Sequence, residues 1–312
     1  MAWLRLVRWN NLFIVMLTQL LVWYCVLLPL HAWTDTPFLL GPLHFALVCI
    51  STILIAAAGY IINDYFDIKI DAINRPQKAI LDRVIDRRQA IIAHSVLNVL
   101  ALVLAGAVAW SAGKWYWLFV QLFSTVLLFF YSSHFKRLYV IGNVVVALLT
   151  ALTIFTLFIY EPGLWYFVSQ PPMLRKGDAE LANPIWVLGI YTGFAFVLTW
   201  MREIVKDMED HIGDAAEGCV TMPIKLGLKR TARFIQLISL AAIIPLVIAS
   251  VKVQGVLGIY TFFVLTLPLT AWVLLLNRRA STQHYHRMSR YLKVIMVSGI
   301  GSLIVYYFQA NA

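Results

Sequence analysis

Long apolar stretches separated by short polar connections recur along the whole 312-residue chain. An apolar run of about 20 residues is long enough to cross the hydrocarbon core of a bilayer as a helix. The pattern predicts nine such helices and an all-α membrane protein with a single transmembrane domain over residues 1–312. The predicted spans are 10–30, 42–62, 90–110, 115–132, 139–160, 185–204, 232–252, 255–276 and 291–309.

The composition supports a membrane protein. Hydrophobic residues make up 61% of the chain and charged residues only 13%, whereas soluble domains carry about 25% charged residues. This excludes a soluble enzyme, a nucleic-acid-binding module and a disordered chain. The first apolar run is long for a signal peptide and no small-residue cleavage pattern follows it, so it is predicted to remain as a membrane helix.

The basic residues predict the topology. Of the 25 Lys and Arg residues, 21 lie in the N-terminal segment or in four connections on the same side as that segment. By the positive-inside rule that side is cytoplasmic, and the C-terminus lies outside. The two longest connections on the predicted cytoplasmic side are expected to form cap loops, at about 61–89 and 205–231. The net charge of +10 then reflects basic loops rather than a nucleic-acid partner.

Eleven of the fifteen carboxylates fall in the two segments that close the second and sixth spans. Each segment contains a row of aspartates at positions i, i+3 and i+7, and the two rows are offset by 143 residues. At about 100° per residue, the members of each row lie within about 60° of one helix face. The rows are Asp64, Asp67 and Asp71, and Asp207, Asp210 and Asp214.

Two facing aspartate rows would repel each other strongly unless cations lay between them. Mg²⁺ is usually held by one or two carboxylates while it shares the phosphates of a substrate. We therefore expect the six aspartates to be metal-binding and catalytic residues that clamp a diphosphate through Mg²⁺. A single row could be only a solvated helix end. However, negative charge at a helix C-terminus is unfavourable, and its repetition at the same spacing favours a cation site.

Polar neighbours of the two rows fit phosphate binding. Asn63 offers an amide, Arg75 and Lys78 follow the first row, and Arg202 and Lys206 accompany the second. Basic side chains would contact the phosphate oxygens that the metal does not coordinate. An alternative stays open for three of them: Arg75 and Lys78 could be topological charges only, and Lys206 lies off the face of its neighbour Asp207.

Three strings carry a resemblance to a known family: GYIINDYFDIKIDAINRP (59–76), REIVKDMEDHIGDAAEG (202–218) and TMPIKLG (221–227). Together with the nine spans they resemble the UbiA superfamily of intramembrane prenyltransferases, and they look most like its digeranylgeranylglyceryl phosphate synthase branch. The resemblance implies a nine-helix bundle with cytoplasmic cap loops. It also implies Mg²⁺-dependent transfer of a long prenyl group from a prenyl diphosphate, through an allylic carbocation, to an acceptor in the membrane.

The implied acceptor is a lipid alcohol similar to geranylgeranylglyceryl phosphate. The alternative within the family is an aromatic acceptor of the 4-hydroxybenzoate type, as in quinone biosynthesis. The partners expected are therefore these two substrates and membrane lipids, without nucleic acid or an evident protein partner.

The family motifs map onto this chain residue by residue. Asn63 and the first aspartate row match the first motif, Asp210 and Asp214 match the second, and Asp207 matches an additional aspartate of the lipid-synthase branch. Arg8 and Asn11 resemble the opening of the first span, although Trp9 replaces a proline. Tyr131 and Lys136 resemble a Tyr-x-x-x-Lys pattern that is one residue longer here, and the resemblance implies that they and Asn11 bind the diphosphate or the acceptor. The stretch from Lys78 to Arg83 departs from the usual cap-loop pattern.

The alternative of another class is a cation-coupled transporter. Sites in such proteins usually lie near the bilayer midplane, often between inverted repeats. Here the carboxylates lie at span ends on one side, and nine spans do not divide into equal halves. The sequence therefore favours an enzyme.

Overall fold

The computed structural model describes residues 1–30, 40–74, 80–171, 173–176, 179–276 and 281–310. Within these ranges, nine helical stretches are long and apolar enough to cross a membrane. This confirms the nine predicted spans. The stretches are Trp9–Leu30, Pro42–Phe66, Arg87–Ser111, Tyr116–Ser133, Ile141–Tyr160, Pro184–Ala216, Leu228–Lys252, Val256–Leu275 and Thr282–Ala310.

Several of these stretches are built from consecutive helical segments. The long elements are α2 (Trp9–Val22) with η1 (Trp23–Leu27), α4 (Pro42–Phe66), α6 (Arg87–Ser111), α7 (Tyr116–Ser133), α8 (Ile141–Tyr160), α9 (Pro184–Ala216), α11 (Leu228–Ile238) with α12 (Leu240–Lys252), α13 (Val256–Tyr260) with η4 (Thr261–Thr266) and α14 (Leu267–Leu275), and α15 (Thr282–Ala310). The short elements are α1 (Ala2–Leu6), α5 (Ile68–Asn74), η2 (Phe135–Arg137), η3 (Pro162–Ser169), β1 (Met173–Lys176), β2 (Ala179–Ala182) and α10 (Met222–Leu226).

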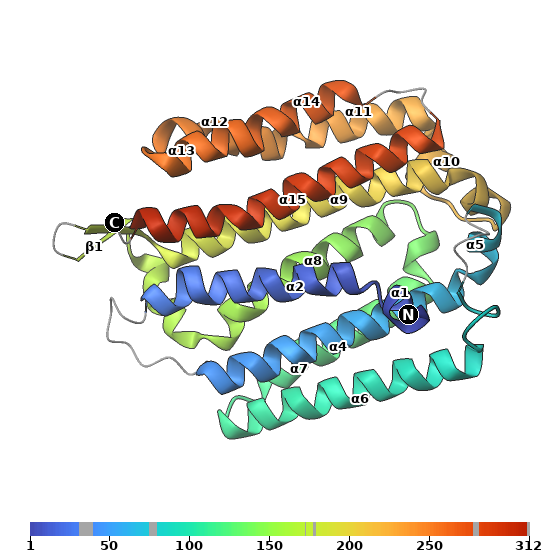
Figure 1. Ribbon diagram of the computed structural model, residues 1–312, viewed down its shortest axis with the longest axis horizontal. Coiled ribbons are helices and arrows are strands. Elements are labelled where there is room, and N and C mark those ends of the chain that lie inside the picture. Colours follow the sequence, from blue (N-terminus) through green and yellow to red (C-terminus); the bar gives the residue numbers. More distant parts are fainter. Residues whose placement is uncertain (31–39, 75–79, 172, 177–178, 277–280, 311–312) are drawn as a thin grey trace.

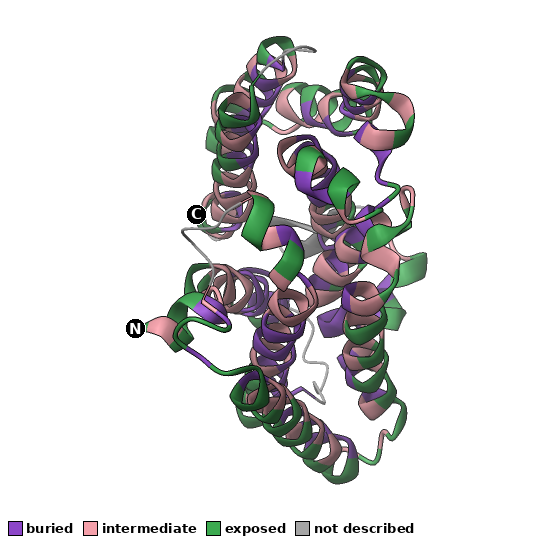
Figure 2. Cartoon of the chain, turned by 90° about the vertical axis from the view of Figure 1, so that its right-hand side faces the viewer, coloured by how far each residue is buried: buried purple, intermediate pink, exposed green. Residues whose placement is uncertain are grey.

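The long helices run roughly side by side along one direction (Figure 1). α5, α10 and the N-terminus lie at one end of the bundle, and β1 lies at the other. Viewed from the end that carries α5 and α10, exposed positions lie mainly on the outer faces of the helices and buried positions on the inner faces (Figure 2). The apolar outer faces are those expected of helices surrounded by lipid rather than water.

Local sequence signals set the ends of the longest helix, α9. The Asn183 side chain accepts a hydrogen bond from the Ile185 amide at 3.0 Å, and Pro184 occupies the first helical position. Both are favourable helix-start features. After Ala216 the chain leaves the helix at Gly218, whose φ of 72° favours glycine.

The predicted cap-loop boundaries need correction. α4 continues to Phe66 and α9 to Ala216, so the starts of the predicted 61–89 and 205–231 loops are helical. Apolar length predicts only the lipid-embedded part of a helix. α9 extends further because Val205 and Met208 still pack in the core.

The connection on the opposite side also contains more structure than expected. Its strands β1 and β2 form an antiparallel hairpin in which Met173 pairs with Ala182. The all-α fold class is otherwise confirmed.

Candidate active site

A cavity of about 760 Å³ lies among α2, α4, α7, α8, α9, α12 and α15. Most of the predicted site residues line it. They are Asn11, Asn63, Asp67, Asp71, Tyr131, Lys136, Arg202, Lys206, Asp207, Asp210 and Asp214. The predicted residues Arg75 and Lys78 lie outside the described residues.

The first aspartate row spans a bend between two helices. α4 ends at Phe66 and α5 begins at Ile68, and Asp67 between them has φ −90° and ψ 0°. Residues in functional sites often adopt this sparsely populated conformation. The Asp67 amide still donates to the Asn63 carbonyl at 3.0 Å and the Asp71 amide to the Asp67 carbonyl at 2.8 Å. The row therefore follows two joined helices rather than one face of a single helix.

Asp67 is the most enclosed member of this row, with 6% of its surface exposed. Its Oδ2 accepts a hydrogen bond from Asn63 Nδ2 at 2.8 Å and forms an ion pair with Lys136. Burial alone would lower the pKa of the Lys136 ammonium, but Asp67 and other nearby acidic groups together raise it. The ion pair with Asp67 therefore favours the charged form of Lys136 at the first row.

A glycine on the next helix lets the turn of Lys136 lie close to the bundle. A Cβ at Gly142 would lie 2.8 Å from the Phe135 carbonyl oxygen and 2.9 Å from the Lys136 Cα. Only glycine permits this approach of η2 to α8. The longer Tyr131–Lys136 spacing thus still places both residues on the cavity.

Asp64 has a different environment from the other aspartates. Its Oδ1 accepts a hydrogen bond from Arg8 Nη2 at 2.7 Å, and the cavity lining does not include it. The Arg8 guanidinium also lies over the Tyr60 ring, 4.9 Å from its centroid. Burial would lower the pKa of Arg8, but Asp64 raises it overall. Arg8 has a left-handed φ of 51°, which is uncommon for a residue other than glycine and often marks a functional position.

The second row lies on one continuous helix, α9, and all three of its members line the cavity. Asn143 on α8 donates from Nδ2 to Asp207 Oδ2 at 2.8 Å. One turn earlier, Glu203 accepts hydrogen bonds from Arg202 Nη1 at 2.9 Å and from Lys206 Nζ at 2.6 Å. Glu203 therefore pairs with both cations.

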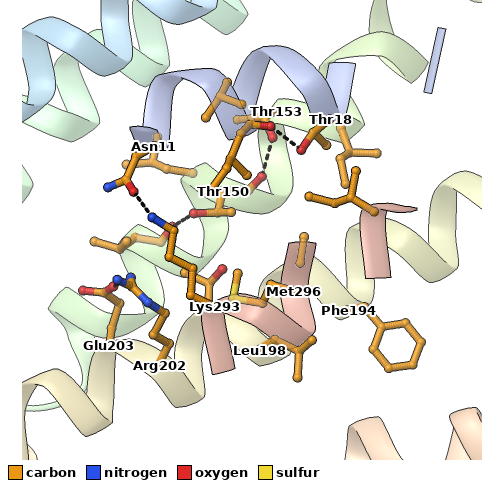
Figure 3. Close-up of a pocket in the computed structure, with 18 of the residues that line it drawn as sticks. Asn11, Thr18, Thr150, Thr153, Phe194, Leu198, Arg202, Glu203, Lys293 and Met296 are labelled. Carbon is orange, nitrogen blue, oxygen red and sulfur yellow. Dashed lines mark hydrogen bonds and ion pairs between the residues drawn. The ribbon is translucent and has the colours of Figure 1, made fainter. Parts of the chain in front are cut away.

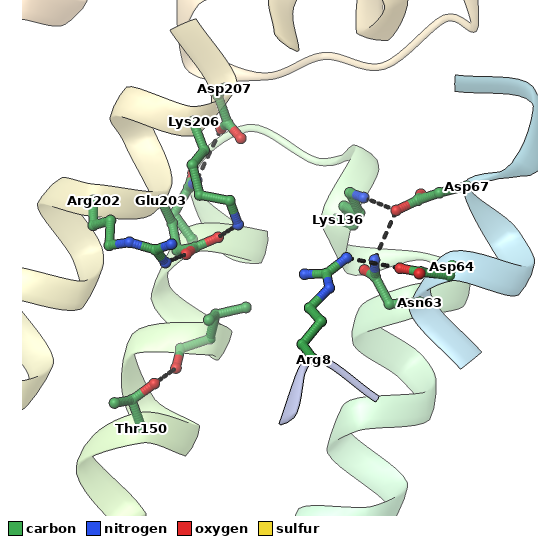
Figure 4. A network of polar contacts seen from close by, with 12 residues as sticks. Arg8, Asn63, Asp64, Asp67, Lys136, Thr150, Arg202, Glu203, Lys206 and Asp207 are labelled. Carbon is green, nitrogen blue, oxygen red and sulfur yellow. Dashed lines mark hydrogen bonds and ion pairs between the residues drawn. The ribbon is translucent and has the colours of Figure 1, made fainter. Parts of the chain in front are cut away.

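The two charged groups face each other across the cavity. Figure 4 shows Arg202, Glu203, Lys206 and Asp207 on α9 opposite Asn63, Asp64 and Asp67, with Arg8 and Lys136 reaching the latter group. Sequence reasoning identified Arg8 only as part of the opening of the first span, not as a site residue, and it missed Asn143 altogether. It also missed Lys293, which lines the cavity. The sequence did contain a signal for this residue, since Lys293 falls inside the predicted last span and charged residues in membrane helices are usually functional.

The donor chemistry fits an ion shared with a substrate rather than a closed metal cage. The cavity presents hard carboxylate oxygens, but within the described residues no three His, Cys, Asp or Glu side chains form a group that could hold a metal ion. Mg²⁺ typically uses one or two carboxylates and takes its remaining ligands from phosphate and water. The aspartates thus fit such an ion, and their role as metal ligands stays a prediction.

Comparison with known proteins identifies the family. Residues 21–295 match the UbiA prenyltransferase family. The chain belongs to this family.

Curated UbiA relatives share a name. The chain is 34% identical to the digeranylgeranylglyceryl phosphate synthase of Methanothermobacter thermautotrophicus over 61% of this chain and 59% of that protein. It thus spans about three-fifths of that relative's length. It is 30% identical to the enzyme of the same name from Thermococcus kodakarensis, over 83% of this chain and 84% of that protein.

Solved UbiA structures share the fold. A structure of digeranylgeranylglyceryl phosphate synthase superposes with a TM-score of 0.66 at 24% identity, covering 99% of this chain and 98% of that chain. A UbiA homologue from Archaeoglobus fulgidus, bound to DMAPP and Mg²⁺, superposes with a TM-score of 0.58 at 16% identity, covering 98% and 100%. The chain is therefore an integral, multi-pass membrane protein of the UbiA fold. UbiA membership does not favour the transporter alternative.

Proposed function

We propose that this chain transfers a long prenyl group from a prenyl diphosphate to the hydroxyl of a glyceryl phosphate lipid, with Mg²⁺. The observation that carries the proposal is the cavity itself, which joins a charged end to a long apolar interior. Carboxylates from α4–α5 and α9 gather at the charged end. Such a shape suits a substrate with an ionic head and a hydrocarbon tail.

The charged end has the groups that the departing diphosphate requires. Arg8 and Lys136 are fixed by Asp64 and Asp67, so their charges are in place before a substrate arrives. Preorganised charge stabilises a transition state more effectively than charge that must reorganise. Mg²⁺ held between the aspartates and the diphosphate would neutralise part of the negative charge.

The family resemblance implies the course of the proposed reaction. The allylic C–O bond breaks with its electron pair staying on the diphosphate, and an allylic carbocation remains. The acceptor hydroxyl oxygen forms the new C–O bond with that carbon, and its proton passes to the departing diphosphate. Apolar side chains such as Ile14, Leu198 and Ile295 line the cavity, and they would keep water from capturing the cation.

The acceptor class is supported by the curated relatives, whose shared name is digeranylgeranylglyceryl phosphate synthase. A geranylgeranylglyceryl phosphate-like acceptor is therefore the first candidate. We further propose that the active site faces the cytoplasm. α5, α10 and the N-terminus share one end of the bundle, and the sequence places most basic residues at that end.

The proposal is tested with purified protein in lipid nanodiscs, Mg²⁺ and geranylgeranyl diphosphate. Geranylgeranylglyceryl phosphate and 4-hydroxybenzoate are offered separately, and the prenylated products are measured by mass spectrometry. The proposal predicts product from the glyceryl phosphate lipid. Product from the aromatic acid alone would place the chain in quinone-type chemistry, and no product from either would contradict the proposal.

A further inference from the structure

A second polar group, which contains two cations, lines the same cavity beside the aspartate rows. It brings together Lys293 of α15, Asn11 of α2 and Arg202 of α9. Lys293 Nζ donates a hydrogen bond to Asn11 Oδ1 at 2.5 Å. In Figure 3 the Lys293 and Arg202 side chains lie near each other at the cavity, with Asn11 above and Glu203 beside Arg202.

These cations outnumber the carboxylates that pair with them. Within the described part of the chain, no carboxylate lies within ion-pair distance of Lys293. Arg202 and Lys206 share the single carboxylate of Glu203. The neighbouring Asp207 bonds instead to Asn143. Lys293, Arg202, Lys206 and Glu203 therefore carry a surplus of two positive charges.

An unsatisfied donor in this group also points to a ligand. Arg202 Nε is buried and has no hydrogen-bond partner among the described residues. Buried polar groups are normally satisfied, and a missing partner requires an explanation. Excess positive charge inside a membrane bundle is costly unless an anion compensates it.

Distance along α9 separates this group from the predicted diphosphate site. Arg202 precedes Asp207 by five residues and Asp214 by twelve, so the second row lies about 7.5 to 18 Å further along the helix at 1.5 Å per residue. A diphosphate bound between the aspartate rows would therefore leave the part of the cavity around Lys293 and Arg202 open for another anion.

We infer that Lys293 and Arg202, with Lys293 oriented by Asn11, bind the phosphate of the acceptor lipid. This inference rests on the proposed function. A phosphate monoester carries a charge near −2 at neutral pH, which matches the surplus of two. The guanidinium of Arg202 provides the planar donor fork suited to phosphate oxygens, and Lys293 adds a point charge. The site would hold the acceptor so that the adjacent hydroxyl faces the reacting prenyl carbon.

The test compares Lys293→Gln with Arg290→Gln, which removes an exposed charge from the same helix. Initial rates are measured with geranylgeranylglyceryl phosphate, with geranylgeranylglycerol, which lacks the phosphate, and with varied geranylgeranyl diphosphate. We expect Lys293→Gln to raise the KM for the phosphorylated acceptor at least about tenfold, the loss expected for one charge-assisted contact. The KM for the diphosphate and the rate with the unphosphorylated alcohol should stay close to wild type, and Arg290→Gln should change none of them.

Lys293→Arg keeps the charge and should restore most of the acceptor affinity, and thermal melts of each variant report on folding. Equal increases in both KM values, or no change in the acceptor KM, would overturn the inference while wild-type activity upheld the proposed function. An inactive wild-type protein with this acceptor would overturn both.

Discussion

Asn74 joins the two aspartate rows through hydrogen bonds at both ends of its side-chain amide. Its Nδ2 donates to the Asp210 carbonyl at 3.0 Å, and its Oδ1 accepts from the Gly213 amide at 3.0 Å. Asn74 is the last residue of α5, whereas Asp210 and Gly213 lie on α9. This contact fixes the end of the first row against the second.

The fit of Asn74 depends on the absence of a side chain at Gly213. A Cβ there would lie 2.5 Å from both polar atoms of the Asn74 amide. Gly213→Ala should therefore displace Asn74, and Asn74→Ala should remove both bonds. Because small misplacements of catalytic groups are costly, each variant should lower kcat by about 10- to 100-fold.

The matched control for Gly213→Ala is Gly189→Ala on the same helix, where an added Cβ has open space. It should retain wild-type turnover in the nanodisc assay. Full activity of Gly213→Ala would show that the spacing of the two rows does not depend on Asn74.

Lys136 should contribute directly to turnover because it holds a positive charge beside Asp67. Lys136→Gln should lower kcat by about 100-fold, as removal of one stabilising donor does in other enzymes. The neighbouring Arg137→Gln removes an exposed charge and serves as the control. Steady-state rates with saturating substrates distinguish the two variants, and equal rates would contradict the assignment of Lys136.

Gly142 should matter through the backbone rather than through chemistry. Gly142→Ala places a methyl group against the Phe135 carbonyl and the Lys136 Cα, so the turn carrying Lys136 must move. We expect kcat to fall by about 10- to 100-fold. Gly106→Ala in α6, where the added Cβ meets nothing, should leave the rate unchanged, and the same outcome for Gly142→Ala would refute the argument.

The sequence predicted the features that depend on one segment at a time. Apolar length predicted the nine spans, and i, i+3, i+7 spacing placed Asp207, Asp210 and Asp214 together on the cavity face of α9. It did not predict the bend at Asp67, because that bend depends on the backbone conformation between α4 and α5.

Contacts between helices were harder to foresee. The Asn143–Asp207, Asn74–Gly213 and Lys293–Asn11 contacts each join two elements far apart in sequence. The pairing of helices depends on side-chain packing. A single asparagine or lysine belongs to no sequence motif that would indicate its partner on another helix. Likewise, the need for glycine at Gly142 and Gly213 can be recognised only when the position of the neighbouring backbone or side chain is known.

The most direct test of the account is the Mg²⁺ dependence of product formation by wild type, Asp67→Ala, Asp210→Ala and the control Asp86→Ala. Asp86 is exposed and precedes α6, outside the cavity. The account predicts that EDTA abolishes and Mg²⁺ restores turnover in wild type and Asp86→Ala. It also predicts that Asp67→Ala and Asp210→Ala stay folded but inactive at every Mg²⁺ concentration. Full turnover by either of these two variants, or by wild type in EDTA, would contradict the claim that two facing aspartate rows bind the diphosphate through Mg²⁺.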